Sequence, residues 1–420
     1  MNILFLCHRI PYPPDKGEKI RAYHMLTHLA GHHTVYLAAF VDDPADMAHA
    51  ATLKQIAGGE CLFVPLNKPA ALARMALALA CGKPLTTSYF ADARIDRWTD
   101  EILERHAIDR VFVFSSAMAP FVMKRRDLDP ARVILDMVDV DSDKWRQYAR
   151  TAVWPQSWVF AREARSLFAL ERRAAATFAA TLFVSPFELR TFAGLAPETR
   201  ARLVSVANGV DLARYRLDAV FPDPFTANEI PVVMVGTMDY RPNVEGAIWL
   251  AEEVLPKIRA KLPMARFYVV GAEPAPGLLK PRDGVVVTGR VDDVRPYVAH
   301  AAAVVAPIRL ARGVQTKVLE GLAMKKPVVA TVAATRGLDV TPGVDLWIED
   351  TPQRFADAVI AAATGPDRDS IAANGRLLAE RDYDWTANLA VLDRLLESGL
   401  RSQVRQVAWN GGRALGEGAE

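Results

Sequence analysis

The sequence is poor in cysteine and has almost no charge imbalance. Its three cysteines, Cys7, Cys61 and Cys81, are too few for a disulfide framework and form no Cys-x-x-Cys pair. We therefore expect three reduced thiols, as in a cytoplasmic protein. The 51 Lys and Arg nearly balance the 49 Asp and Glu, so the formal net charge is only +2. This balance does not favour a nucleic-acid-binding protein, and any basic patch must be local.

Export and membrane-spanning segments are also lacking. Residues 2–7 have no basic leader before them and read as a strand rather than as a signal peptide. The most apolar stretch, residues 70–81, is interrupted by Arg74 and is far shorter than the ~20 residues of a membrane span. We predict a buried helix there, with a shallow, peripheral contact at the inner face of the membrane as the alternative.

Two nucleotide-binding fingerprints are missing as well. The chain contains neither Gly-x-Gly-x-x-Gly nor a Walker A sequence. This argues against a dinucleotide-dependent oxidoreductase and against a P-loop enzyme. We expect no cofactor and no resident metal.

What is present is a regular alternation of strand-like and helical patterns. Near-continuous apolar runs suit parallel strands that are covered on both faces by helices. The runs are 3–7, 35–41, 61–65, 111–114, 133–138, 181–184, 203–206, 232–235, 266–270, 285–288, 303–306, 328–330 and 346–348. A single core stops growing at roughly 250–300 residues, so 420 residues predict two domains. The expected fold class is α/β, with two Rossmann-like, doubly wound parallel-sheet lobes facing a cleft.

The domain boundaries follow from composition. A polar, proline-rich segment at 221–225 marks the linker region between the two halves. We assign 1–210 to the first lobe, joined by a C-terminal helix at 385–398, and 211–384 to the second lobe. Residues 401–420 are rich in Gly, Arg and small residues and are expected to be a mobile tail.

The first candidate site is the loop after the opening strand. Asp15-Lys16-Gly17 leads into a helix that begins near Glu18. A glycine at a strand-to-helix turn lets the backbone approach a phosphate, and a helix N-terminus favours negative charge. An ordinary connecting loop is the alternative.

The second candidate site is acidic. Asp136, Asp139, Asp141 and Asp143 follow one buried strand within eight positions. Such crowding is costly unless cations or hydroxyl groups share the site. A metal site lacks support from a nearby His or Cys, and acidic residues also cap helices. We favour a sugar- or acceptor-binding role, with Asp139 as the candidate catalytic carboxylate.

The third candidate site is the most informative. A strand ends at 306, and a loop with Gly313 leads to a helix whose entrance carries Gln315 and Thr316. The entrance offers free N–H groups to an anion, and Lys317 adds a positive charge. Glu320 lies one turn further on the same face, where an acid can accept hydrogen bonds from ribose hydroxyls. An incidental Lys–Glu surface pair is the alternative.

Two further loops follow strands of the same half. The segment from Gly236 to Asn243 contains Arg241 and starts a helix. Arg290 and Val291 follow the strand-like run at 285–288. Both loops belong to the strand-end region of the third site, although plain turn chemistry would also explain them.

Together these segments resemble glycosyltransferase family 4, the retaining nucleotide-sugar transferases of the GT-B fold. The resemblance covers nearly the whole chain. It rests on the segments 208–211, 235–243, 289–291, 317–329 and 383–385. Within that family, residues 136–148 and 313–324 resemble the sugar transferases of exosortase-associated exopolysaccharide loci.

The resemblance implies a function for each motif. Gly17 would approach the donor diphosphate, Arg241 and Lys317 would neutralise it, and Glu320 would bind the ribose. The backbone at 290–291 would contact the base. The implied reaction is metal-independent transfer of a sugar from a nucleotide diphosphate sugar to a glycan or a lipid-linked acceptor. The implied location is the cytoplasm.

The sequence departs from the family pattern at three places. Arg312 stands at the first position of the Glu-x7-Glu motif, and Thr237 stands where an Arg is common. The family's first-lobe histidine is expected to be replaced within 136–141. Two alternatives therefore stay open: a nucleotide-sugar 2-epimerase of the same fold, which needs no acceptor, and a non-catalytic scaffold of a polysaccharide assembly complex.

Overall fold

The computed structural model describes residues 1–14, 17–309 and 314–397. Three expectations fall outside these ranges: those for Gly313, for Arg312 and for the tail at 401–420. The chain divides into two compact units. The first unit is Met1–Ala207 with the chain from Leu389 onward, and the second unit is Asn208–Asn388. These divisions lie a few residues from the boundaries assigned from composition.

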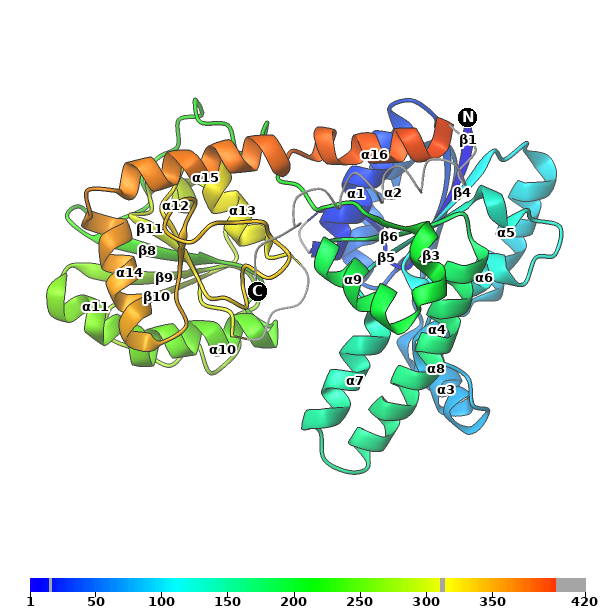
Figure 1. Ribbon diagram of the computed structural model, residues 1–420, viewed down its shortest axis with the longest axis horizontal. Coiled ribbons are helices and arrows are strands. Elements are labelled where there is room, and N and C mark those ends of the chain that lie inside the picture. The colour runs from blue at the N-terminus through cyan, green and yellow to red at the C-terminus, as the bar shows by residue number, and fades with distance from the viewer. Residues whose placement is uncertain (15–16, 310–313, 398–420) are drawn as a thin grey trace, which may run out of the picture. The chain divides into compact units, whose positions relative to one another are not determined.

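The first unit is built on a seven-stranded parallel sheet (Figure 1) with the order β3-β2-β1-β4-β5-β6-β7. Its strands are β1 Asn2–Cys7, β2 Thr34–Val41, β3 Gly58–Pro65, β4 Arg110–Phe114, β5 Val133–Val138, β6 Ala180–Phe183 and β7 Leu203–Ser205. Its helices are α1 Gly17–Ala30, α2 Ala50–Ala57, α3 Lys68–Ala80, α4 Leu85–Tyr89, α5 Ala93–Arg105, α6 Pro120–Met123, α7 Asp141–Thr151, α8 Gln156–Thr177 and α9 Pro186–Leu195. Short 3-10 turns lie at Pro44–His49, Ser116–Met118, Pro130–Arg132 and Pro197–Arg202.

The core of the first unit lies on both faces of this sheet, as the apolar strand runs require. Phe5 of β1 stacks on Phe112 of β4 with ring centroids 5.0 Å apart, and both rings are fully buried. The last helix, α16 Trp385–Glu397, packs on this unit through buried Leu392 and Leu395. His28 of α1 contacts Asp393 at 2.9 Å.

The second unit is built on a six-stranded parallel sheet with the order β10-β9-β8-β11-β12-β13. Its strands are β8 Ile230–Val235, β9 Ala265–Val270, β10 Val285–Gly289, β11 Ala303–Ala306, β12 Val328–Ala330 and β13 Trp347–Ile348. Its helices are α10 Arg241–Trp249, α11 Leu255–Lys261, α12 Arg295–His300, α13 Thr316–Ala323, α14 Pro352–Thr364 and α15 Arg368–Asp382, and a π turn at Leu250–Val254 joins α10 to α11. The strand order places the carboxyl ends of β8 and β11 side by side.

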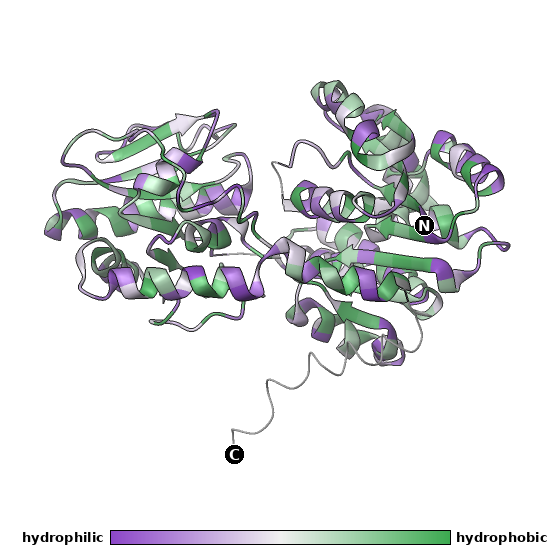
Figure 2. Ribbon diagram, turned by 90° about the horizontal axis from the view of Figure 1, so that it is seen from above, coloured by the Kyte–Doolittle hydropathy of each residue, from purple (hydrophilic) through white to green (hydrophobic). Residues whose placement is uncertain are grey.

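The predicted α/β fold class is confirmed, and each of the thirteen predicted runs overlaps a strand. The strands are the most uniformly hydrophobic elements in Figure 2, whereas most helices carry hydrophilic residues along one side. None of the helices in the described ranges is long and apolar enough to cross a bilayer.

The predicted buried helix at 70–81 is wrong in its burial. The helix forms as α3, but only Ala71 and Ala78 are buried. Leu72 and Leu77 are 59% and 67% exposed. The pattern of apolar residues predicted the helix, but it could not predict that the apolar side chains would face solvent.

Candidate functional site

The third candidate site forms at the carboxyl edge of the second sheet. β11 ends at Ala306, and α13 begins at Thr316, so Lys317 lies in the first turn of the helix. Lys317 is only 8% exposed. Its Nζ donates hydrogen bonds to Asn243 Oδ1 at 2.9 Å and to Gln315 Oε1 at 3.4 Å. The ammonium group is therefore held at the helix entrance by two neutral amide side chains.

Asn243 connects this lysine to the loop after β8. It lies in the first turn of α10, is buried, and its Nδ2 donates to the carbonyl of Thr237 at 2.8 Å. A Cβ on Gly236 would lie 2.7 Å from Asn243 Nδ2 and 3.5 Å from the Cε of Lys317. Only glycine fits at position 236 without displacing this amide. Gly236, Gln315 and Lys317, which the sequence analysis selected separately, thus meet around Asn243.

The second sheet also brings two glycines together beside this site. Gly271 follows β9 with a φ of +151°, and a Cβ there would lie 1.7 Å from the carbonyl oxygen of Gly236. No side chain can occupy that space. The carboxyl ends of β8 and β9 are therefore closely packed backbone, which leaves peptide groups at the strand edge.

Burial changes the protonation of Lys317. It lowers the pKa of the ammonium group from 10.5 to about 8, and the negative charge of Glu320 opposes that shift. A buried cation favours an anionic ligand, because the ligand replaces the solvation that burial has removed. The helix N-terminus adds partial positive charge in the same place.

Glu320 lies one turn beyond Lys317, as expected, but it has its own partner. Its carboxyl group is hydrogen-bonded to the side chain of Tyr215, and burial raises its pKa. Burial also raises the pKa of Tyr215 well above 10, and Glu320 adds to the effect. Tyr215 was not found from the sequence, because no local pattern links it to α13. Asn243 was visible as part of a motif, but nothing marked it as the partner of Lys317.

The other predicted residues of the second unit lie around this cluster. Arg241 opens α10 with an exposed side chain, and its Nε pairs with Glu245 at 2.6 Å. Arg309, which follows β11, lies with its guanidinium carbon 5.9 Å from the centre of the Trp249 ring. Exposed Arg290 and half-buried Val291 follow β10, at the edge of the sheet beyond β9. Thr316, also half-buried, is the first residue of α13.

In the first unit, the structure separates the roles of the clustered carboxylates. Asp136 is fully buried and pairs with equally buried Arg21, whose Nε lies 2.8 Å from Asp136 Oδ2. Asp143 lies in the first turn of α7 and pairs with Arg146 at 3.2 Å. Both carboxylates therefore have cationic partners within this unit.

Asp139 is different. Within the described ranges, its Oδ1 is buried and has no hydrogen-bond partner. Burial raises its pKa from 3.8 to about 7, and the negative charges of Glu188 and Asp141 add to the shift. A buried carboxyl oxygen without a hydrogen bond is costly, and such groups concentrate where a ligand binds. The sequence-based choice of Asp139 stays a prediction, now with a geometric reason.

Two more polar groups at the same sheet edge lack partners among the described residues. His8 follows β1, and its Nδ1 has no hydrogen bond, while Ser116 follows β4 with an unpaired buried Oγ. Burial lowers the pKa of His8 to about 4, so the ring is neutral. It stacks on Phe114 with an interplanar angle of 6°. Because β1, β4 and β5 are neighbours in the sheet, His8, Ser116 and Asp139 lie along one edge. His8 and Ser116 were not predicted from the sequence, since an isolated His or Ser after a strand carries no motif.

Gly17 also belongs to the first unit. It is the first residue of α1 and is exposed, and a Cβ built on it would contact nothing within 4 Å. The chain packing around Gly17 therefore does not require glycine. Its predicted role at the donor stays a prediction.

No group of three His, Cys, Asp or Glu side chains able to hold a metal occurs in the part of the chain that the structure describes. The three cysteines are free, with Cys7 buried and Cys81 exposed.

The two parallel sheets with their helices define a two-lobed α/β fold of the GT-B glycosyltransferase type. Solved structures with this fold cover nearly the whole chain. Anabaena Alr3699/HepE in complex with UDP and glucose matches with a TM-score of 0.61 and 14% identity over 94% of this chain and 99% of that chain. Sucrose-phosphate synthase from Thermosynechococcus elongatus matches with a TM-score of 0.65 and 14% identity over 94% and 98%. WaaG, a glycosyltransferase of lipopolysaccharide biosynthesis, matches with a TM-score of 0.65 and 16% identity over 94% and 100%.

A sequence-family comparison gives a narrower result for the second unit. Residues 229–364 match the family described as "Glycosyl transferases group 1". The matched range contains Gly236, Asn243, Lys317 and Glu320, which form the site described above. No curated protein sequence matches the chain.

Proposed function

We propose that the chain is a retaining glycosyltransferase that moves a sugar from a nucleotide diphosphate sugar to a glycan or a lipid-linked acceptor. The observation that carries this proposal is the buried Lys317 at the start of α13. It lies inside the segment that matches the glycosyl transferase family, and Asn243 and Gln315 hold its Nζ in place. The structures of HepE with UDP and with UDP-glucose support a nucleotide diphosphate sugar as the donor.

The proposed chemistry is electrostatic. Negative charge grows on the departing diphosphate, and a cation that is already in place stabilises that charge without reorganisation. Lys317 and the N–H groups at Gln315 and Thr316 supply positive potential at one point. Arg241 would add a second cation after leaving Glu245, which its exposed position permits. In this scheme no metal ion is needed.

The remaining donor contacts follow the positions of the side chains. Glu320, which is half-buried and hydrogen-bonded to Tyr215, would accept hydrogen bonds from the ribose hydroxyls. The backbone at 290–291 would contact the base, and Gly17 would approach the diphosphate from the first unit.

We propose the first sheet edge as the acceptor side. Asp139 and His8 offer unpaired buried polar atoms and Ser116 an unpaired hydroxyl. Such groups suit the hydroxyls of a neutral sugar. We place the reaction in exopolysaccharide synthesis, in the cytoplasm, with a peripheral position at the inner face of the membrane.

The test is a donor screen with and without acceptor, in the presence of a metal chelator. Transfer from one nucleotide sugar that persists with chelator and retains the anomeric configuration, read by NMR, is the expected result. Conversion of the donor into its 2-epimer without acceptor would replace the proposal by the epimerase. Loss of transfer on chelation would overturn metal independence.

A further inference from the structure

Helix α3 of the first unit turns apolar side chains to solvent and its internal charged side chain toward the protein. Its outward face consists of Leu72, Ala73, Ala76, Leu77 and Ala80, all exposed. Its internal charged residue, Arg74, points inward instead, where Nε and Nη2 donate to the carbonyls of Ser88 and Tyr89 at 3.1 and 3.0 Å. A surface helix normally turns its charges to water and its apolar face to the core.

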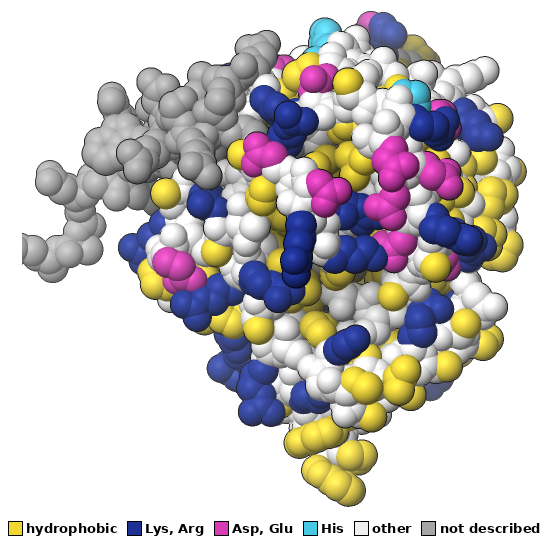
Figure 3. Space-filling view, turned by 90° about the vertical axis from the view of Figure 1, so that its right-hand side faces the viewer, with side chains coloured by type: hydrophobic (Ala, Val, Ile, Leu, Met, Phe, Trp, Pro, Cys, Tyr) yellow, Lys and Arg dark blue, Asp and Glu magenta, His cyan; other side chains and the backbone are white. Residues whose placement is uncertain are grey.

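The turn between α7 and α8 exposes larger apolar side chains. Val153 is 76% exposed, Trp154 80% and Trp158 53%. This turn is the lowest point of the first unit in Figure 1. Figure 3, turned about the vertical axis, shows hydrophobic side chains gathered at that lowest tip, with Lys and Arg above them and most acidic side chains in the upper half.

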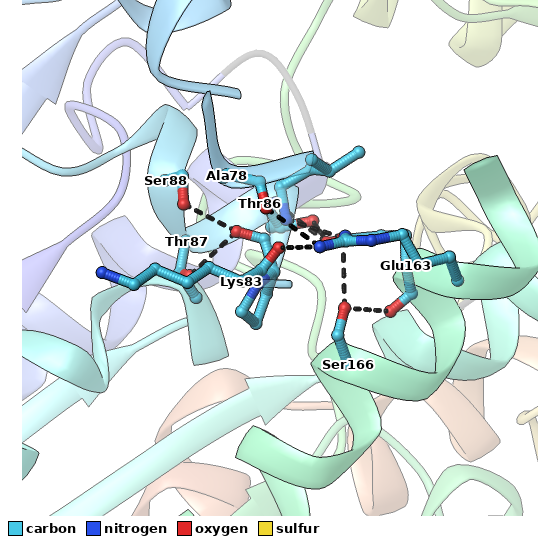
Figure 4. Close-up of polar contacts among 10 residues, drawn as sticks. Ala78, Lys83, Thr86, Thr87, Ser88, Glu163 and Ser166 are labelled. Atoms are coloured by element: carbon cyan, nitrogen blue, oxygen red, sulfur yellow. Dashed lines mark hydrogen bonds and ion pairs between the residues drawn. The ribbon is translucent and has the colours of Figure 1, made fainter. Parts of the chain in front are cut away.

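Polar contacts join α3 to the α7–α8 hairpin. Arg162 of α8 donates to the carbonyls of Ala78 and Lys83, both at 2.9 Å, and so caps the C-terminal end of α3. Buried Glu163 accepts hydrogen bonds from the backbone N–H groups of Leu85 and Thr86 at 2.6 and 2.9 Å. Figure 4 shows Glu163 directed at the start of α4, between Thr86 and Ser166. The exposed face of α3 and the α7–α8 turn therefore belong to one rigid surface.

The two segments that form this surface carry positively charged side chains and no negatively charged ones. Residues 61–91 and 144–162 together contain seven Lys or Arg and no Asp or Glu, although the whole chain is nearly balanced. Lys68 and Lys83 flank α3, and Arg150 lies one residue before the last residue of α7, all three exposed. Exposed tryptophan beside basic side chains is typical of proteins that sit at the interface of an anionic membrane.

We infer that α3 and the α7–α8 turn form a lipid-docking surface that binds anionic bilayers through Leu72, Leu77, Val153 and Trp154 and the flanking cations. The inference rests on the peripheral membrane position given in the proposed function and names the surface responsible, but it is tested separately from sugar transfer, which lipid binding does not need. α7 starts two residues after Asp139 and has 11 residues, so it spans ~16 Å. A docked turn would thus hold the Asp139 loop about that far from the bilayer surface, within reach of the head of a lipid-linked acceptor.

The test is co-sedimentation of the full chain with vesicles of phosphatidylcholine alone or of phosphatidylcholine and phosphatidylglycerol in equal parts. We expect binding to the anionic vesicles only, weakened by salt. The double variants Val153→Ser/Trp154→Ser and Leu72→Gln/Leu77→Gln should each weaken it at least about tenfold, because they remove inserted apolar area. Lys68→Gln and Lys83→Gln should each cost about fivefold.

The matched control is Val220→Ser/Leu279→Gln, which removes two apolar side chains exposed in the second unit, at 97% and 59%. It should bind like the unmodified chain, and all variants should keep the same melting temperature. Equal binding by the turn variant, or equal binding to neutral vesicles, would overturn the inference. So would self-association that the turn variant abolishes, because the surface would then be a protein interface. Vesicle binding without transferase activity would leave the inference standing and contradict only the proposed function.

Discussion

The carboxyl edges of the two sheets are incomplete in different ways. In the second unit, Lys317 has hydrogen-bond partners in Asn243 and Gln315, but these amides are neutral, and the described residues form no ion pair with its ammonium group. In the first unit, His8, Ser116 and Asp139 have unpaired polar atoms within the described ranges. A missing counter-charge calls for an anion, whereas missing hydrogen bonds call for a neutral polar ligand. Under the proposed function, we therefore assign the diphosphate to the second edge and the sugar hydroxyls to the first.

The largest effect is expected in the first unit, on the free energy of unfolding when Asp139 is replaced. The pKa of Asp139 is raised in the folded chain, to about 7 from 3.8, so the folded state favours the protonated form. The associated stability is fully present below about pH 4 and is lost as the pH rises through 7. Asp139→Asn should therefore raise the free energy of unfolding above pH 7, by at most about 4 kcal/mol.

Urea unfolding at pH 5 and pH 8 measures this effect. The gain should be larger at pH 8, and exposed Asp218→Asn should show no such increase. A loss of stability in Asp139→Asn at pH 8 would contradict this, because it would mean that the ionised carboxylate has a stabilising partner.

The second-largest effect is expected from removing the buried cation of the second unit. Lys317→Ala removes the buried cation, and turnover should fall about 10²–10³-fold, since charge growing on the diphosphate loses its stabilising partner. The fold should persist, because the desolvated ammonium group is itself costly. Steady-state kinetics and a melting curve check both statements, with exposed Lys257→Ala as the control. Near-normal turnover would remove Lys317 from the site.

The third effect concerns backbone packing. Gly236→Ala places a Cβ 2.7 Å from Asn243 Nδ2, so the amide must shift and release Lys317. We expect a stability loss of about 1–3 kcal/mol together with weaker diphosphate binding. Gly194→Ala has open space around its Cβ inside α9, and should be neutral or stabilising. Equal stability of the two variants would show that the glycine contact is unimportant.

The smallest effect is a pH dependence. Because the pKa of Lys317 is about 8, the amine is mostly charged at pH 7 and mostly neutral at pH 9. The Kd of a nucleotide diphosphate should rise about tenfold between these values, as the unbound protein must first take up a proton. Calorimetric titration at both pH values, with Lys317→Ala as the reference, checks this. A Kd unchanged between them would assign the anion to another group.

The strands were predictable and the site was predictable only in part, for physical reasons. Parallel strands covered on both faces are continuous apolar runs, so each appears in the sequence by itself. Lys317 was predictable because a strand, a glycine loop and a helix start lie in one short segment. Its partner Asn243 comes from a distant segment of the chain, at the start of α10. The face of α3 that turns to solvent depends on the hydrogen bond that Arg74 donates to Ser88. Both are tertiary contacts, and no local sequence pattern predicts them.

The most direct test of the account is thermal stabilisation by a panel of nucleotide diphosphates, with and without magnesium, on the unmodified chain and on Lys317→Ala. We expect the melting temperature to rise with nucleotides of one base. The rise should grow with ligand concentration as mass action requires, persist without metal, and be lost in Lys317→Ala. No shift with any nucleotide would contradict the donor site and favour a non-catalytic scaffold. An undiminished shift in Lys317→Ala would show that the diphosphate binds elsewhere.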